Sequence, residues 1–410
     1  MTTIGIIAEY NPFHNGHSYQ IQKVKKQSNA DFVVVLMSGD YVQRGIPAIT
    51  DKYTRTRMAL AAGADMVLQL PLQLSTASAE QFAYGGVSIL HRLGFIDGLS
   101  YGCETQQPSL LIEVAKFLSA PPKEYEESLQ SALKTGLPYP LARQNAIFAH
   151  HTPLSDCTPE EIQGFLSSPN NILAIEYEKA KLTIPHCHLT SLPIYRENNY
   201  HDTDLTSTFP SASAIRTQYK ITGHLENCQD CIPDTAYPIL AEAERKSFPV
   251  EIDDFSTLLY YKLLQTSQYD IYEDCNHSLE KKIIKNLPSF TTISAFTDLL
   301  KSKELVHTRI YRSLLHILLS VKKRASEEPA PYVRLLGSKR SACGLLKQTN
   351  QIPVITKVAD AKQQLSPTSY AQFKKELDTA HLYRRICMDK FGYDLGSEFQ
   401  HSPIIIQDEK

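Results

Sequence analysis

Four short apolar runs recur about every 30 residues at the start of the chain, which is the length of a β-α-β unit. They read TIGIIAEY near Ile4, DFVVVLMS at Phe32, DMVLQLP at Met66 and IDGLSYG at Ile96. Each run is bounded by polar residues or by Gly and Pro, as buried strands are. Because the runs are almost continuously apolar, both faces of the sheet must be covered. The spacing and the pattern together predict a parallel, doubly wound sheet.

Helical patterns fill the intervals between these runs. They extend over Ser18–Gln27, Lys52–Ala62 and Ser78–Leu93. Doubly wound sheets bind ligands outside the carboxyl ends of their strands. The segment at that position after the first run is EYNPFHNGHSYQI, so it is the first place to look for chemistry.

The rest of the chain has a different character. Its 410 residues suit two or three domains, and 42% hydrophobic residues suit an ordinary globular core. The segment NCQDCIPDTAYP breaks the periodicity, and beyond it helical patterns dominate as far as Phe391. We therefore expect an α/β domain over 1–235 and a mainly α-helical domain over 236–410.

Composition excludes several classes of protein. A net charge of -2 does not indicate nucleic acid globally, although a local patch is still possible. No stretch approaches the roughly 20 apolar residues of a membrane span, and the N-terminus lacks a signal peptide. We expect a cytoplasmic protein with reduced thiols and no membrane partner. Cys228 and Cys231 form a CxxC, but only this one pair has zinc-ligand spacing, so a surface turn is favoured and no metal site is predicted.

The two histidines of the HNGH segment suit phosphate chemistry. A helix should begin near His17 or Ser18, and its free N–H groups attract anions. His14 and His17, three residues apart on an exposed first turn, would face the same bound group. Imidazoles can donate hydrogen bonds to phosphate oxygens as negative charge builds during displacement. Both histidines are predicted to be catalytic, against the simpler interpretation of ordinary surface histidines beside an Asn-Gly turn.

The HNGH stretch resembles the HxGH signature of the nucleotidyltransferase superfamily, which is related to class I aminoacyl-tRNA synthetases. The resemblance implies a Rossmann-like nucleotidyltransferase domain and attack on the α-phosphate of ATP, with pyrophosphate leaving. A second, serine-rich motif of that superfamily holds the β- and γ-phosphates. PSASAIR stands in its place, with Ser211, Ser213 and Arg216, and it departs from the commoner form at Ala212 and Ala214.

Four blocks in the same order resemble, more narrowly, the tRNA(Met) cytidine acetate ligase family. They are GIIAEYNPFHNGHSYQI, MSGDYVQRGIPAITDKYTRTRMAL, SPNNILAIEY and YHDTDL. This resemblance implies activation of acetate by ATP as acetyl-adenylate, with Mg²⁺ on the triphosphate. It further implies transfer of the acetyl group to the wobble cytidine of elongator tRNA(Met), which makes N4-acetylcytidine.

The same resemblance implies which residues contact ATP. Among later positions it favours Asn170 over Asn171, although an asparagine there can simply cap a helix. It also implies a contact by Gly102, which equally suits a strand-end turn, and by Arg196. The full set is Ile7, Ala8, Glu9, Tyr10, Asn11, Pro12, Phe13, His14, Asn15, Gly16, His17, Ser18, Tyr19, Gln20, Gly102, Asn170, Arg196, Ser211, Ser213 and Arg216.

Two groups of cations are candidates for RNA or phosphate contact. Residues 301–347 hold eleven Lys and Arg against three acidic residues, which suits an RNA backbone more than a solvated helix. The expected contacts there are Lys322, Lys323, Arg324, Lys339 and Arg340. The second group, after the second strand, is Arg44, Lys52, Arg55 and Arg57, which form either a solvated helix face or a phosphate-binding surface.

Two other functions remain open at this stage. A small-molecule adenylyltransferase would share the histidines but would need a phosphate acceptor site and no basic helical domain. A non-catalytic RNA-binding protein with a vestigial nucleotide pocket is the other, and the intact HNGH segment argues against it. The residues alone lead to adenylyl transfer, whereas acetate and the tRNA come from the resemblance.

Overall fold

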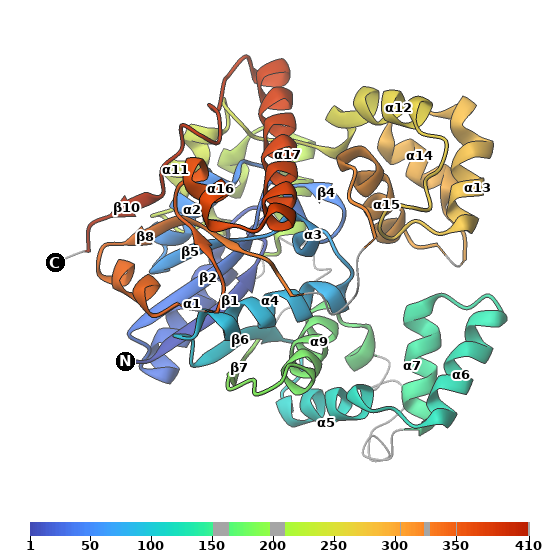
Figure 1. The fold of residues 1–410 in the computed structure, drawn as a ribbon, viewed down its shortest axis with the longest axis horizontal. Helices are drawn as coiled ribbons and strands as arrows, with labels where there is room; N and C mark the ends of the chain where they lie inside the picture. Colours follow the sequence, from blue (N-terminus) through green and yellow to red (C-terminus); the bar gives the residue numbers. More distant parts are fainter. Residues whose placement is uncertain (151–163, 197–209, 304, 324–328, 350, 409–410) are drawn as a thin grey trace.

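A single mixed sheet organises the molecule (Figure 1). The structure is a computed structural model, and it describes all residues except 151–163, 197–209, 304, 324–328, 350 and 409–410. The strand order is β10-β8-β5-β2-β1-β6-β7, with β9 beside β8. The strands are β1 (Thr3–Ala8), β2 (Phe32–Ser38), β5 (Met66–Leu70), β6 (Gly98–Cys103), β7 (Thr190–Tyr195), β8 (Val333–Lys339), β9 (Val354–Ile355) and β10 (Ile404–Ile406).

The four apolar runs form the parallel centre of this sheet, which confirms the predicted fold class. β1 lies between β2 and β6, and Ile4 is opposite Val33 in the register. Residues alternate between two cores along each strand. Val34 belongs to one apolar cluster and Val35 to the other, so both faces of the sheet are covered as the pattern requires.

Helices cover the two faces where the sequence pattern places them. The helix expected from Ser18 begins three residues earlier, because His14 caps it. The helices beside the sheet are α1 (Asn15–Ser28), α2 (Lys52–Ala61), α3 (Leu72–Ser75), α4 (Ala79–Leu93), α5 (Pro108–Ser119), α9 (Pro169–Thr183), α10 (Ala212–Thr222) and α11 (Tyr237–Ala243). A short hairpin of β3 (Tyr41–Val42) and β4 (Ile46–Pro47) follows β2.

Two helical units project from the sheet domain in Figure 1. One is the hairpin of α6 (Lys123–Lys134) and α7 (Tyr139–His150). The other is a bundle with its own apolar core, to which Phe255, Leu279 and Ile310 contribute. Its helices are α12 (Ser256–Gln265), α13 (His277–Asn286), α14 (Ile293–Leu300) and α15 (His307–Leu319).

The second half of the chain departs from a purely helical pattern. After the bundle the chain returns to the sheet and adds β8, β9 and β10 before and after the long helix α17 (Pro367–Phe391). β8 is buried, and it runs antiparallel to β5, so the sheet is not wholly parallel. The apolar run VRLLG supplies this strand, but it lies within a basic segment that masks its β character. The segment 236–410 is therefore not an all-helical unit, and a domain boundary at 235/236 stays a prediction.

Among the described residues, no helix is both long enough and apolar enough to cross a membrane.

Candidate active site

The segment after β1 is locked into one path by buried groups. Tyr10 has a positive φ of 52°, and the bond between Asn11 and Pro12 is cis. The Asn11 side-chain oxygen accepts a hydrogen bond from the backbone N–H of Ile49 at 2.7 Å. Tyr10 and Phe13 are 1% and 0% exposed and pack edge to face. This rigid turn delivers the chain to the start of α1.

His14 and His17 begin α1 by capping it with their rings. The Gly16 N–H donates to Nδ1 of His14 at 3.1 Å, and the His14 N–H donates to Nδ1 of His17 at 3.2 Å. The two rings lie 3.7 Å apart between centroids. His14 is only 2% exposed, so the expectation of an exposed pair is wrong for this residue. The reason is that the His14 side chain caps α1 and therefore faces back into the protein instead of toward solvent.

These contacts fix the protonation of both imidazoles. Because each Nδ1 accepts a hydrogen bond, the ring proton of the neutral form is on Nε2. Burial, followed by the positive charges of Arg196 and Arg216, holds the pKa of His14 well below its ordinary value. Burial, His14 and Arg196 do the same to the pKa of His17. Both rings are therefore neutral Nε2–H donors at neutral pH.

Arg196 lies beside the histidines at the ends of two strands. Its backbone N–H donates to the carbonyl of Cys103 at 2.8 Å, which continues the pairing of β6 with β7. A Cβ on Gly102 would lie 2.8 Å from Cδ of Arg196. A Cβ on Gly16 would lie 2.9 Å from His14 Cε1 and 3.1 Å from Arg196 Nη2. Both glycines therefore make room for this arginine and the histidine ring.

The PSASAIR segment meets the HNGH segment through Arg216. Ser211 caps α10 by accepting from the Ala214 N–H at 3.1 Å. Arg216 donates to the carbonyl of Asn11 at 2.5 Å and to Oγ of Ser213 at 3.0 Å. The structure thus brings together two segments about 200 residues apart that the sequence assigned to one site.

The two asparagines that start α9 have different tasks. Asn171 is buried, and its side-chain oxygen accepts from the Glu104 N–H at 2.8 Å while its amide donates to Phe165. Asn170 is half-buried and donates to the Glu104 carboxylate at 2.5 Å. Ser168 caps the helix. The Asn171 side chain therefore holds the chain that follows β6 in place. Asn170 is the more exposed of the two asparagines.

Several residues of the expected ATP-binding run have side chains that serve the fold. Tyr10, Asn11, Pro12, Phe13 and Ser18 are buried, and the side-chain oxygen of Asn11 is engaged by the Ile49 N–H. His14 is buried as well, and the remaining residues of the run are half-buried: Ile7, Ala8, Glu9, Asn15, Gly16, His17, Tyr19 and Gln20. The Gln20 side-chain amide donates to Oγ of Ser100 on β6 at 3.3 Å.

Arg55 is a residue that the sequence interpretation placed wrongly. It is 0% exposed, so it lies neither on a solvated helix face nor on a phosphate-binding surface. Its guanidinium donates to the carbonyl oxygens of Glu9, Ser38 and Gly39, which lie where β1 and β2 end, and to that of Thr50, just before α2. In the sequence, an arginine within an amphipathic segment looks the same whether it is buried against carbonyl oxygens or exposed to solvent.

Lys52 was placed wrongly for the same reason. It is 1% exposed and forms ion pairs with Asp40 at 2.7 Å and Glu398 at 2.8 Å. Arg57 is exposed and pairs with Glu242, which fits the solvated face. Arg44 is half-buried in the β3–β4 hairpin.

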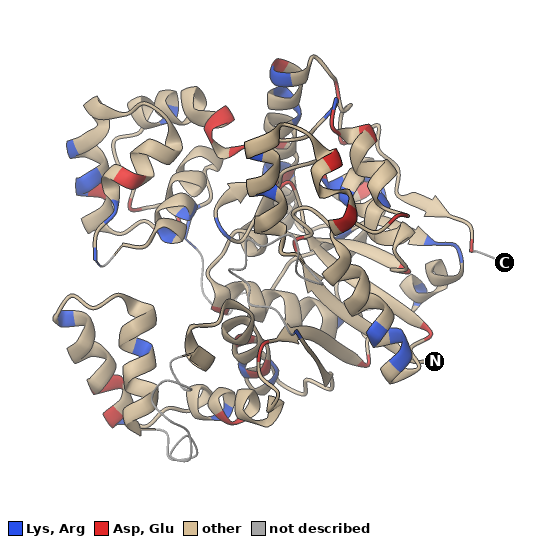
Figure 2. Ribbon diagram, turned by 180° about the vertical axis from the view of Figure 1, so that it is seen from behind, with Lys and Arg blue, Asp and Glu red and all other residues tan. Residues whose placement is uncertain are grey.

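The basic segment 301–347 does not form one patch. Lys322 and Lys323 are exposed after α15, whereas Lys339 pairs with Asp65 at 3.1 Å at the end of β8, next to exposed Arg340. Figure 1 places these two ends on opposite sides of α17, and Figure 2 shows cations scattered among acidic residues. Arg324 and the YHDTDL segment lie outside the described residues.

The CxxC pair lies in the core rather than on a surface turn. Cys228 and Cys231 are 0% and 3% exposed and pack in the cluster below α10. Burial raises the pKa of Cys228 to about 11, so its thiol stays protonated. This apolar packing explains the pair without a metal ion.

Comparisons with known proteins agree with the geometry of this site. The family model described as HIGH Nucleotidyl Transferase matches residues 1–395. A tRNA(Met) cytidine acetate ligase of Thermoanaerobacter sp. (strain X514) is 37% identical over 93% of this chain and 95% of its own. The tRNA(Met) cytidine acetate ligase of Clostridium novyi is 32% identical over 99% and 100%. The chain belongs to the tRNA(Met) cytidine acetate ligase family.

Solved structures extend this membership to the fold. The crystal structure of Thermotoga maritima TmcAL superposes with a TM-score of 0.91 at 26% identity, and covers 100% of both chains. A second crystal form of that protein, bound with alpha-thio ATP, has a TM-score of 0.89 at 25% identity. The segment after the bundle, which adds β8 and β10 to the sheet, therefore belongs to the part of the fold that the family shares.

Proposed function

We propose that this chain activates acetate with ATP and acetylates the wobble cytidine of elongator tRNA(Met) to N4-acetylcytidine. The observation that carries the proposal is the pair of neutral, closely packed histidines at the start of α1, with Arg196 and Arg216 beside them. Family membership supplies the substrates, because the relatives are named for this ligase activity.

In the first step, a carboxylate oxygen of acetate attacks the α-phosphorus of ATP and pyrophosphate leaves. Negative charge grows on the α-phosphoryl oxygens, and fixed donors aimed at that charge accelerate the step. The Nε2–H groups of His14 and His17 are such donors, since both Nδ1 atoms are occupied by the backbone. We assign Arg216 and Ser213 to the outer phosphates, and Asn170 and Gly102 to the nucleoside side.

In the second step, the exocyclic amine of cytidine attacks the acetyl carbon of acetyl-adenylate. The bond from that carbon to the phosphate oxygen breaks, AMP leaves, and the amine gives up one proton. The base must leave its stack to reach an anhydride held at the carboxyl edge of the sheet.

Mg²⁺ enters this scheme with the nucleotide. The described side chains around His14 are imidazole and guanidinium donors, which suit phosphate oxygens and do not suit a cation. We therefore assign Mg²⁺ to the triphosphate as part of the substrate, with no dedicated protein site. The tRNA substrate places the reaction in the cytoplasm.

The decisive experiment is nucleoside mass spectrometry of unmodified tRNA(Met) incubated with the protein, ATP and acetate. We expect N4-acetylcytidine, together with AMP and pyrophosphate. Formation of ADP and phosphate would contradict attack on the α-phosphorus. Adenylylation of a small phosphate-bearing acceptor, without modified tRNA, would favour the small-molecule adenylyltransferase.

A further inference from the structure

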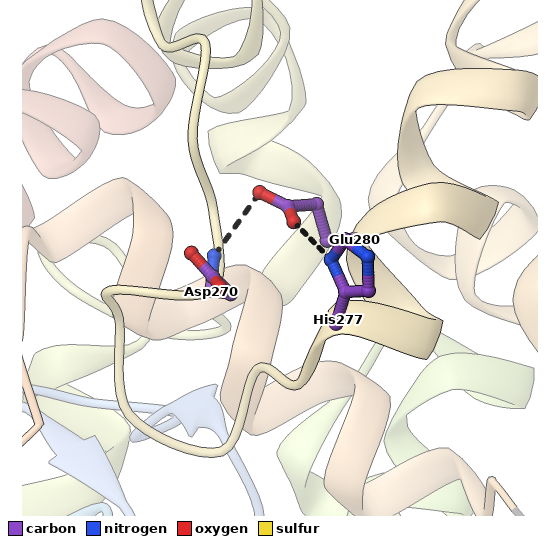
Figure 3. A group of neighbouring side chains, drawn as sticks. All are labelled: Asp270, His277 and Glu280. Atoms are coloured by element: carbon purple, nitrogen blue, oxygen red, sulfur yellow. Dashed lines mark hydrogen bonds and ion pairs between the residues drawn. The ribbon is translucent and has the colours of Figure 1, made fainter.

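A second cluster of chemically active side chains lies in the helical bundle, away from the histidine pair. Asp270 belongs to the loop between α12 and α13, and His277 and Glu280 belong to the first turn of α13. One potential ligand atom from each side chain lies within 4.8 Å of the other two. Figure 3 shows the three side chains gathered between the loop and the start of the helix.

Glu280 is a buried carboxylate that the loop holds in place. One oxygen accepts the backbone N–H groups of Tyr269 at 2.7 Å and Asp270 at 3.3 Å, and the other accepts from Nδ1 of His277 at 3.0 Å. These hydrogen bonds fix the position of both carboxylate oxygens.

Asp270 next to it is short of partners. Its Oδ1 atom is buried and makes no hydrogen bond among the described residues. A buried carboxylate oxygen without a donor is costly, and a second carboxylate within a few ångströms adds repulsion. Within the described part of the chain, the cluster therefore leaves one buried carboxylate oxygen without a donor.

We propose that Asp270, His277 and Glu280 bind one divalent transition-metal ion, with Zn²⁺ as the preferred species. Two carboxylates balance the charge of the ion, and the orphaned oxygen of Asp270 gains a partner. The imidazole favours zinc and its neighbours over Mg²⁺ or Ca²⁺. The 3.0 Å between His277 Nδ1 and Glu280 fits two ligands on one ion at about 2.0–2.2 Å each. When the ion binds at Nδ1, the neutral ring of His277 changes tautomer, so that its one proton moves through solvent from Nδ1 to Nε2.

The ion would fix a loop that connects several parts of the bundle. Asp274 of that loop binds Arg312 of α15 at 2.8 Å. The Glu273 N–H donates to Val321, and the Lys323 N–H donates to Ile271. The segment that carries Lys322 and Lys323 is thus hydrogen-bonded to the metal-binding loop. Only this consequence for RNA contact rests on the proposed function, because metal binding itself does not require it.

The test is a titration of metal-stripped protein with Zn²⁺ alone, by isothermal calorimetry and by thermal unfolding, without ATP or tRNA. The variants are His277→Ala and Asp270→Asn, and the matched control is His307→Ala. His307 pairs with Asp298 at 2.8 Å in the same bundle, and among the described residues this pair has no third potential ligand. We expect one site in wild type and in the control, and at least tenfold weaker binding in both variants.

In thermal unfolding, the order of stability of wild type and Asp270→Asn should reverse when Zn²⁺ is added. A purely structural role of Asp270 would not produce this reversal. Without metal, Asp270→Asn should unfold at the same temperature as wild type or higher, because it removes a carboxylate that has one unpartnered oxygen and lies beside a second carboxylate. With Zn²⁺, wild type should become the more stable of the two. The same zinc isotherm for wild type and His277→Ala would overturn the proposal, and so would an Asp270→Asn variant that zinc stabilises as much as wild type.

Discussion

At the scale of single residues, the proposed mechanism gives the two histidines separate tasks on different nitrogens. Each Nδ1 accepts a backbone N–H at the N-terminus of α1, and each Nε2–H is the donor proposed for the phosphate. A residue that caps a helix cannot move without unwinding its first turn. The donors are therefore preorganised, which is what stabilisation of developing phosphoryl charge requires.

This division of labour predicts that the cap and the catalytic donor can be separated at position 14. His14→Asn keeps an oxygen that accepts the Gly16 N–H, since Asn is a good N-cap, but it removes Nε2–H. We expect acetyl transfer to fall by about 10²–10³-fold while the unfolding temperature stays near that of wild type. His14→Ala should lose activity and also about 1 kcal/mol of stability. Activity near that of wild type in His14→Asn would remove His14 from the reaction.

At the scale of elements, Arg55 of α2 joins the carboxyl ends of two central strands. Four carbonyl oxygens converge on one guanidinium, including that of Glu9, next to the turn that leads to His14. Lysine has a single ammonium group and cannot span them. The position of the HNGH segment thus depends on a helix that contributes no group to the reaction.

Arg55→Lys should therefore reduce stability and activity together. We expect a loss of about 3 kcal/mol in the free energy of unfolding, because buried carbonyls lose charged donors. Acetylation should fall at least tenfold. The matched control is Arg57→Ala on the same helix, whose exposed pair with Glu242 is worth about 0–1 kcal/mol. Urea unfolding checks both variants, and equal effects of the two would contradict the role of Arg55.

The long helix α17 is joined to the sheet by a buried acid. Glu376 accepts from Gln69 of β5 at 2.7 Å and from the Leu72 N–H at 2.9 Å. Burial raises its pKa from 4.5 to about 7, against the opposing effect of the Leu72 N–H. In this pH range the native state keeps a proton that the unfolded state releases. The stabilising effect is complete below the unfolded pKa and is lost as the pH rises through 7.

Glu376→Gln should remove this pH dependence. The stability of wild type relative to the variant should fall between about pH 5 and pH 7, by at most roughly 1.4 kcal/mol per pH unit, and then level off. Urea unfolding across this range measures the difference. Glu126→Gln, at an exposed position of α6, is the control and should follow wild type throughout. Parallel curves for wild type and Glu376→Gln would refute the assignment.

At the scale of the whole molecule, local patterns predicted the centre of the fold and long-range packing decided the rest. The strands near Ile4 and Phe32 and the HNGH segment follow from periodicity and turn chemistry. The burial of Lys52 depends on Glu398, 346 residues away, and no local pattern carries such a pairing. The basic run 301–347 failed as a patch because the chain divides it between a bundle and a strand. A high count of Lys and Arg along a segment therefore does not show that these side chains share one surface.

A last prediction concerns RNA binding by the helical bundle. Lys322 and Lys323 follow α15 and are exposed, whereas the histidine pair belongs to the start of α1. A Lys322→Ala/Lys323→Ala variant should therefore bind tRNA more weakly but keep acetate-driven exchange of pyrophosphate into ATP. Each phosphate contact that is lost should lower the slope of log affinity against log salt by roughly 0.7–0.9.

Two comparisons make this test selective. Lys23→Ala/Lys26→Ala removes the same charge from α1, away from the bundle, and should leave tRNA affinity unchanged. Lys339→Ala/Arg340→Ala should have a smaller effect than Lys322→Ala/Lys323→Ala, because Lys339 already pairs with Asp65. If the bundle variant keeps both the affinity and the salt slope of wild type, these lysines do not bind RNA. If exchange fails along with tRNA binding, the two sites are coupled, and activation of acetate then depends on an intact bundle.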